Sequence, residues 1–93
     1  MNDGTYIKTE RGFEPVFVKT GYWVGEYEVK DLSQDLEIGD YLGVWTDPYG
    51  NVWYDRTHLI TDLGTAYILA NKWKQFAIWD NENKVALTPA PGY

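Results

Sequence analysis

The chain has 93 residues, a formal net charge of −6 and no cysteine. This length fits a single domain spanning residues 1–93, and the lack of cysteine excludes disulfides and thiolate metal sites. Excess negative charge argues against direct contact with nucleic acid, because the phosphate backbone is recognised by clustered lysine and arginine.

The sequence also lacks the marks of a secreted or membrane protein. Its first residues, MNDGTYIKTERGFEP, contain neither the basic start nor the apolar stretch of a signal peptide. No apolar run approaches the about 20 residues of a membrane span, so we expect a cytoplasmic protein without membrane contact. Aromatic side chains form 17% of the sequence, and since each buries about 150–250 Å² they help a small core to offset chain entropy.

The first third of the chain predicts three strands. Residues 6–10 alternate in polarity and end at an arginine–glycine turn signal. A second strand over residues 13–19 has proline early in it, as at a sheet edge or a strand start, and a third covers residues 22–29. Residues 30–40 have no clear period and suit at most one short helical turn.

Residues 41–56 predict a β-hairpin. Its turn, DPYG, begins at Asp47 and has the residues of a type I turn in a three-residue loop with a bulge, because glycine takes the left-handed position. Counting back from the turn sets Trp45 against Trp53 as a cross-strand aromatic pair on one face. The other face then carries Leu42, Val44, Val52 and Tyr54.

One principal helix follows, with Thr61 or Asp62 as its cap. Apolar residues recur at helical spacing on the face expected to pack on the sheet; they are Leu63, Ala66, Tyr67, Ala70 and Trp73. A short strand over residues 76–79, a polar turn, a last strand over residues 84–87 and an irregular tail complete the chain. The predicted class is α+β, an antiparallel or mixed sheet of about five to seven strands with one principal helix packed on one face.

Residues suited to enzyme chemistry are scarce. His58 is the only histidine, and Asp55 is the nearby carboxylate that would orient it as a base. The strand carrying Asp55 is expected to end at Arg56, which leaves a strand-end ion pair and an imidazole in a loop. Ser33, the only serine, lacks the glycines of a nucleophile elbow, so we predict no catalytic residue and a protein that is not an enzyme.

No metal or cofactor is expected either. One histidine without cysteine leaves only an oxygen-rich Ca²⁺ or Mg²⁺ site, and residues 80–83 (DNEN) lack the glycine and distal glutamate of an EF-hand loop. We interpret them as a hairpin turn. The glycines match neither a phosphate-binding loop nor a dinucleotide fingerprint.

Negative charge concentrates in the middle of the chain. Seven carboxylates and only one lysine, Lys30, lie between residues 26 and 47; the carboxylates are Glu26, Glu28, Asp31, Asp35, Glu37, Asp40 and Asp47. Carboxylates two positions apart on a strand are about 6.5–7 Å apart, the order of the phosphate spacing along a nucleic-acid strand. Such a patch fits the basic groove of a nucleic-acid-handling protein, with an attraction that salt weakens. Ordinary solubilising charge is the competing interpretation.

The C-terminal half resembles a known pattern. GVWTDPYGNVWYDRTH, an alanine-containing helix and KQFAIWD are similar to a pattern in small proteins of phages, plasmids and their bacterial hosts. The match covers a little under half of the chain, over turn, core and strand-end positions. The resemblance implies a small accessory protein of a mobile element, and no activity.

Together with the acidic segment, this resemblance implies a non-catalytic inhibitor of a host nucleic-acid-handling or defence protein, such as a nuclease or a CRISPR effector. The expected partner has a basic surface, and the predicted binding residues are the seven carboxylates together with Trp45 and Trp53. If the helix covers only one face of the sheet, the open face carries either these two tryptophans or Leu42, Val44 and Tyr54, and exposed aromatic patches mark interfaces. The alternative is a homo-oligomeric structural or assembly protein of a phage, which would use the aromatic face for self-association.

Overall fold

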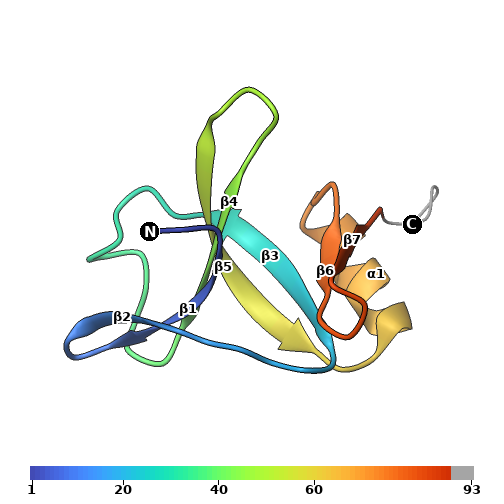
Figure 1. Cartoon of the computed structure of the whole chain (residues 1–93), viewed down its shortest axis with the longest axis horizontal. Coiled ribbons are helices and arrows are strands. Elements are labelled where there is room, and N and C mark those ends of the chain that lie inside the picture. Colours follow the sequence, from blue (N-terminus) through green and yellow to red (C-terminus); the bar gives the residue numbers. More distant parts are fainter. Residues whose placement is uncertain (89–93) are drawn as a thin grey trace. The chain divides into compact units, whose positions relative to one another are not determined.

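The computed structural model describes residues 1–88, which form seven strands and one helix (Figure 1). In chain order these are β1 (Gly4–Thr9), β2 (Gly12–Pro15), β3 (Tyr22–Glu28), β4 (Tyr41–Thr46), β5 (Val52–Ile60), α1 (Leu63–Lys72), β6 (Ile78–Asp80) and β7 (Val85–Leu87). The strands form one sheet in the order β2-β1-β4-β5-β3-β6-β7. The predicted α+β class is confirmed. Within the described residues, no helix is long and apolar enough to cross a membrane.

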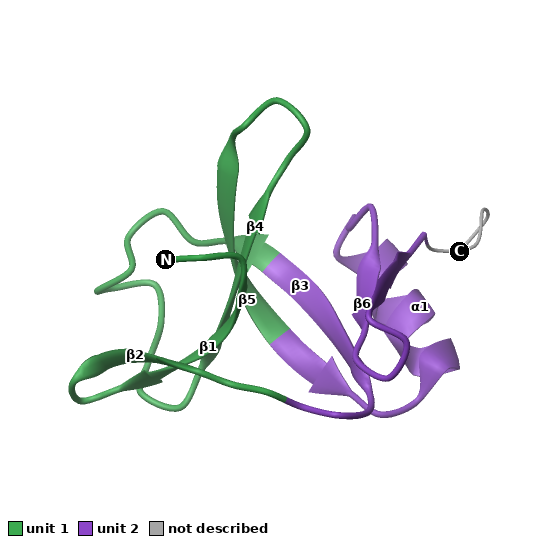
Figure 2. Ribbon diagram, viewed as in Figure 1, with its two compact units in different colours: residues 1–17, 27–57 green, residues 18–26, 58–93 purple. Residues whose placement is uncertain are grey.

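Two compact units divide the chain, and both are discontinuous in sequence (Figure 2). Unit 1 consists of Met1–Phe17 and Tyr27–Thr57, and unit 2 of Val18–Glu26 and His58–Tyr93. Each unit has a hydrophobic core of its own. The expectation of a single domain over residues 1–93 stays a prediction.

The core of unit 1 lies between its strands and an irregular loop. Leu42 and Val44 of β4 are buried in it. The loop, residues 30–40, is named the acidic loop here, and it contributes the buried Leu36 and the partly buried Leu32 to the same core. One face of the unit 1 strands is therefore covered by a segment that contains turns and no helix.

The β4–β5 hairpin has the predicted turn and register. The N–H of Asp47 donates to the carbonyl of Asn51 at 2.9 Å, and the N–H of Gly50 donates to the carbonyl of Asp47 at 3.0 Å. Gly50 has a φ of 88°, in the left-handed region that favours glycine. Trp45 lies opposite Trp53, as the turn chemistry predicts.

Helix α1 covers the core of unit 2. It begins after Asp62, whose carboxylate accepts the N–H of Thr65 at 2.8 Å, so the predicted cap is confirmed. Ala66 and Ala70 on the inner face are fully buried against side chains of β3 and β6. The predicted packing of one helix face on the strands is confirmed except at Leu63, which is 36% exposed.

Two predicted strands are too long. The strand predicted over residues 13–19 ends at Pro15, although the N–H of Val16 still donates to the carbonyl of Thr5 at 2.8 Å. The strand predicted over residues 76–79 begins only at Ile78, since the backbone just before it still bonds the last turn of α1; Phe76 is 89% exposed. The tail predicted to be irregular lies, beyond Thr88, outside the described residues.

The fifth strand is longer than predicted. β5 continues past Arg56 to Ile60. Thr57 is buried and still pairs with Tyr41 of β4, and Ile60 packs on the core of unit 2. Contacts distant in sequence therefore extend this strand beyond its local signal.

Candidate protein-binding surface

The two tryptophans of the hairpin form an exposed stacked pair. The ring centroids of Trp45 and Trp53 are 5.8 Å apart and the ring planes differ by 17°. The two residues are 43% and 36% exposed. Because side chains alternate along a strand, the pair lies on the face opposite the one that directs Leu42 and Val44 into the core. The acidic loop packs on that core face, which leaves much of the tryptophan surface in solvent.

Each indole N–H of the pair donates a hydrogen bond to an aspartate. Trp45 Nε1 donates to Asp55 at 2.9 Å, and Trp53 Nε1 donates to Asp47 at 3.0 Å. Both polar ring atoms are therefore satisfied within unit 1, and the rings are oriented although they are not buried. The surface left for a ligand is carbon and the π-face of the indole.

The two aspartates differ in how readily they ionise. The indole N–H of Trp53 and the backbone donors of the turn lower the pKa of Asp47. Partial burial raises the pKa of Asp55, against the opposing effect of the Trp45 N–H donor. Asp47 is therefore the more firmly charged of the two.

A third carboxylate reaches the hairpin from the N-terminal segment. Asp3 accepts the hydroxyl of Thr46 at 2.8 Å and its backbone N–H at 3.2 Å. Among residues 1–88, neither Asp3 nor Asp47 nor Asp55 forms an ion pair with a basic side chain. The donors that hold these three carboxylates are all neutral groups.

Sequence reasoning missed Asp55 and Asp3 as part of this surface. Asp55 lies opposite Gly43 and is thus the diagonal neighbour of Trp45 on the same face, so the predicted register contained the signal for it. Asp3 left no comparable signal, because 43 residues separate it from Thr46.

Two of the predicted binding carboxylates form hydrogen bonds that stabilise the conformation of the acidic loop. Asp31 accepts the hydroxyl of Ser33 at 2.6 Å, and this bond is the main cause of the lowered pKa of Asp31. Asp35 accepts the backbone N–H groups of Lys30 and Asp31, both at 3.0 Å. The Asp35 N–H also donates to the Asp31 carbonyl at 2.9 Å, which closes a turn over residues 31–35.

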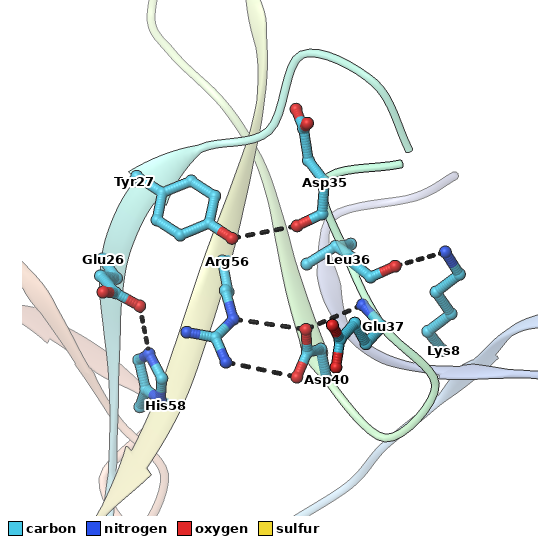
Figure 3. Close-up of polar contacts among 9 residues, drawn as sticks. All are labelled: Lys8, Glu26, Tyr27, Asp35, Leu36, Glu37, Asp40, Arg56 and His58. Carbon is cyan, nitrogen blue, oxygen red and sulfur yellow. Dashed lines mark hydrogen bonds and ion pairs between the residues drawn. The ribbon is translucent and has the colours of Figure 1, made fainter. Parts of the chain in front are cut away.

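Two basic side chains fasten the acidic loop to the strands of unit 1 (Figure 3). The ammonium of Lys8 on β1 donates to loop carbonyls, among them that of Leu36. The guanidinium of Arg56 on β5 pairs with Asp40 at 3.3 Å and lies 6.0 Å from the ring centroid of Tyr27. Asp40, another predicted binding residue, is therefore engaged within the fold.

Glu28 and Glu37 are the predicted carboxylates most open to a partner. Glu28 forms an exposed ion pair with Lys30 at 3.7 Å, a type of contact that contributes little to stability. The carboxylate of Glu37 has no hydrogen bond or ion pair within the described part of the chain, while its backbone N–H donates to Asp40 (Figure 3). Both residues are exposed, and within the described part of unit 1 they are the members of the acidic set whose carboxylates accept no backbone N–H.

Glu26, the remaining predicted carboxylate, belongs to unit 2 and bonds His58. Glu26 Oε1 and His58 Nε2 are 2.8 Å apart (Figure 3), and the imidazole centroid is 5.1 Å from that of Trp73. The prediction that His58 lies in a loop past a strand end is wrong, because β5 contains it. The predicted strand-end ion pair is also wrong, since Asp55 bonds an indole and Arg56 pairs elsewhere.

A depression in unit 1 lies beside the acidic loop. It has a volume of about 360 Å³, and Lys8, Phe13 and Leu32 are among its lining residues. Because the Lys8 ammonium is already bonded to loop carbonyls, the depression offers no open basic group to a ligand.

No protein-family model, curated protein or solved structure matches this chain. Within residues 1–88, no group of three or more histidine, aspartate or glutamate side chains is placed to hold a metal ion.

Proposed function

We propose that this protein is a non-catalytic binding module that attaches through unit 1 to a basic surface of a partner protein. Its specific form is an inhibitor, carried by a phage or another mobile element, of a host nucleic-acid-handling or defence protein such as a nuclease or a CRISPR effector. The observation that carries the proposal is the exposed Trp45–Trp53 stack, held by two aspartates in a chain of net charge −6.

Ordered, exposed tryptophans support binding to another protein. Tryptophan is enriched among the few side chains that dominate the energy of protein interfaces. A pair whose rings are already oriented loses little side-chain entropy on binding, so more of its contact energy appears as affinity. Scattered exposed apolar residues are ordinary, whereas two stacked tryptophans, 43% and 36% exposed, form one continuous aromatic surface.

Fixed negative charge supports a basic partner. The carboxylates of Asp31 and Asp47 have lowered pKa values because neutral donors stabilise their ionised form. Glu28 and Glu37 add exposed charge on the same unit. Such a surface attracts basic proteins, above all those that bind phosphate backbones, and the attraction weakens with salt.

Affinity capture from host lysate tests the proposal, with charge reversals as matched baits. Glu37→Lys and Glu14→Lys both reverse an exposed glutamate of unit 1 and change the net charge equally, but Glu14 lies on β2 outside the acidic set. We expect the wild type and E14K to recover one and the same basic protein, and E37K to recover less of it. The purified partner should then lose its activity on nucleic acid when titrated with the wild type, and regain it at high salt.

Equal recovery of that protein by all three baits at every salt concentration would contradict the proposal. Recovery of no basic or nucleic-acid-binding protein at low salt would contradict it as well.

Self-association as a structural component of a phage is the second candidate. It is favoured by exposed apolar side chains in unit 2, namely Ile68, Phe76, Trp79 and Val85, which are 56%, 89%, 43% and 45% exposed. Light scattering at micromolar concentration separates the candidates. A stable oligomer that Phe76→Ser dissociates supports self-association, and a monomer supports the binding module.

A further inference from the structure

The hairpin surface combines two features that select a particular kind of side chain. The first is indole surface whose polar edges are occupied, since Trp45 and Trp53 each donate their N–H to a carboxylate. A ligand therefore meets the π-face and carbon edges of the rings. The negative face of an aromatic ring attracts cations, and tryptophan does so more strongly than tyrosine or phenylalanine.

The second feature is negative charge without a basic partner. Asp3, Asp47 and Asp55 gather around the same hairpin strands, and within residues 1–88 no lysine, arginine or histidine forms an ion pair with any of them. Each carboxylate has two oxygens, and Asp55 is bonded through only one of them, Oδ2, to the neutral indole of Trp45. A cation placed on the tryptophans would therefore lie beside uncompensated carboxylates.

Arginine fits this combination better than lysine. A guanidinium is planar, stacks on aromatic rings and donates in a fork to carboxylate oxygens. It is also less strongly hydrated than an ammonium, so it costs less to place on an apolar surface. Unit 1 contains the same combination of contacts internally, where Arg56 pairs with Asp40 and lies 6.0 Å from the ring centroid of Tyr27.

We propose that the Trp45–Trp53 pair, with Asp47 and Asp55, is a recognition site for an arginine side chain of the partner protein. This proposal rests on the proposed function, because it names the chemical group through which the basic partner is recognised. The arginine lies on the indole surface and donates to a carboxylate at its edge. The remaining carboxylates of unit 1 steer association, and the tryptophan pair supplies specificity.

Peptide titrations test the site without the partner. The probes are three short synthetic peptides in which glycine alternates with arginine, with lysine or with citrulline, the neutral analogue of arginine. The readout is the set of indole N–H signals in a ¹H–¹⁵N NMR spectrum, where assigned signals report each tryptophan separately. We expect the arginine peptide to shift the signals of Trp45 and Trp53, the lysine peptide to bind about three- to thirtyfold more weakly, and the citrulline peptide not to bind.

Two variants with the same loss of charge locate the site. Asp55→Asn keeps an oxygen that accepts the Trp45 N–H but removes the charge, and Glu14→Gln removes a charge from β2 of the same unit. We expect D55N to weaken the arginine peptide several-fold more than E14Q does. Trp45→Leu, which leaves the turn residues intact, should abolish the selectivity for arginine over lysine.

The outcomes separate this proposal from the proposed function. If the basic partner binds the wild type and Trp45→Leu equally well and the peptides shift no indole signal, the arginine site is overturned while the binding module stands. If arginine and lysine peptides bind alike and D55N matches E14Q, only diffuse charge attraction operates and the site is again overturned. A dimer that Trp45→Leu dissociates would assign the tryptophan surface to a second copy of the chain, and that also overturns the proposal.

Discussion

In unit 1 and unit 2, different kinds of segment pack on the strands and cover the hydrophobic core. In unit 2, helix α1 lies on the strands and buries Ala66 and Ala70, and its backbone bonds are satisfied within the helix itself. In unit 1 the irregular acidic loop covers the strands instead, and its Leu32 and Leu36 pack into the core. A covering loop has no internal ladder of hydrogen bonds, so side chains must satisfy its backbone groups.

This difference explains much of the acidity of the acidic loop. Asp31, Asp35 and Asp40 accept backbone N–H groups of the acidic loop, while Lys8 donates to its carbonyls. Several carboxylates therefore have a structural role that is independent of any partner. Glu28 and Glu37 lack such a role, and they are the residues whose charge is best explained by binding or solubility.

Truncating the anchor of the acidic loop should give the largest effect. Leu36 is 3% exposed, and a leucine-to-alanine change in a core costs about 2–5 kcal/mol because it removes contacts and leaves a cavity. We expect Leu36→Ala to lower the free energy of unfolding in urea by this amount and to speed amide exchange across residues 30–40. The control is Ile38→Ala in the same loop, where the side chain is 64% exposed; a similar loss there would show that the loop is not anchored through Leu36.

Enlarging the contact of α1 should have the next largest effect. Ala66 is fully buried, and adding carbon to a packed interface costs about 1–3 kcal/mol through forced shifts of its neighbours. Ala66→Leu should therefore lower the free energy of unfolding, whereas Ile68→Leu on the exposed side of α1 should leave it within about 0.5 kcal/mol. Equal behaviour of the two variants would mean that α1 is not closely packed on its strands.

In each unit, an aspartate bonded to a nearby hydroxyl stabilises the segment that packs on the strands: Asp31 in the acidic loop and Asp62 at the start of α1. A change of pH tests this similarity. The Ser33 hydroxyl is the main cause of the lowered pKa of Asp31, and the Thr65 backbone N–H and hydroxyl lower the pKa of Asp62. A lowered pKa means that each carboxylate stabilises the fold above its unfolded-state pKa of about 3.9, and that this contribution is lost as the pH falls through the folded-state value. NMR titration of Ser33→Ala should show the pKa of Asp31 raised and that of Asp62 unchanged. Thr65→Ala should do the reverse, although its backbone donor keeps part of the effect on Asp62.

The smallest effect concerns the uncovered face of unit 1, where Asp47 and Asp55 should respond to pH in opposite directions. The lowered pKa of Asp47 stabilises the fold above about pH 4, so the difference in unfolding free energy between wild type and Asp47→Asn should shrink in acid. Burial raises the pKa of Asp55, so its contribution is present in acid and is lost as the pH rises through the folded-state value. Urea unfolding from pH 3 to 7 checks this, and parallel profiles for D47N and D55N would refute the distinction.

Local chemistry allowed the hairpin to be predicted almost completely. The turn at Asp47 and Gly50 depends on residues adjacent in sequence, and it fixed the register that opposes Trp45 and Trp53. The cap of α1 at Asp62 is local in the same way.

The parts that sequence reasoning missed depend on contacts distant in the chain. β5 extends far enough to contain His58, and the partner of that imidazole is Glu26, 32 residues earlier. The bonds from Lys8 to the acidic loop join residues 24 to 28 positions apart. No local pattern encodes these pairings, because each requires the strands to be assembled first.

The stacked geometry of Trp45 and Trp53 also makes the hairpin an optical reporter. Two indoles with centroids 5.8 Å apart couple their electronic transitions, and the coupled pair should produce an exciton couplet in the far-ultraviolet circular dichroism. Fluorescence sums over all five tryptophans of the chain, whereas the couplet exists only while these two rings are held together. Its amplitude should follow the opening of this one hairpin during heating, in the unlabelled protein.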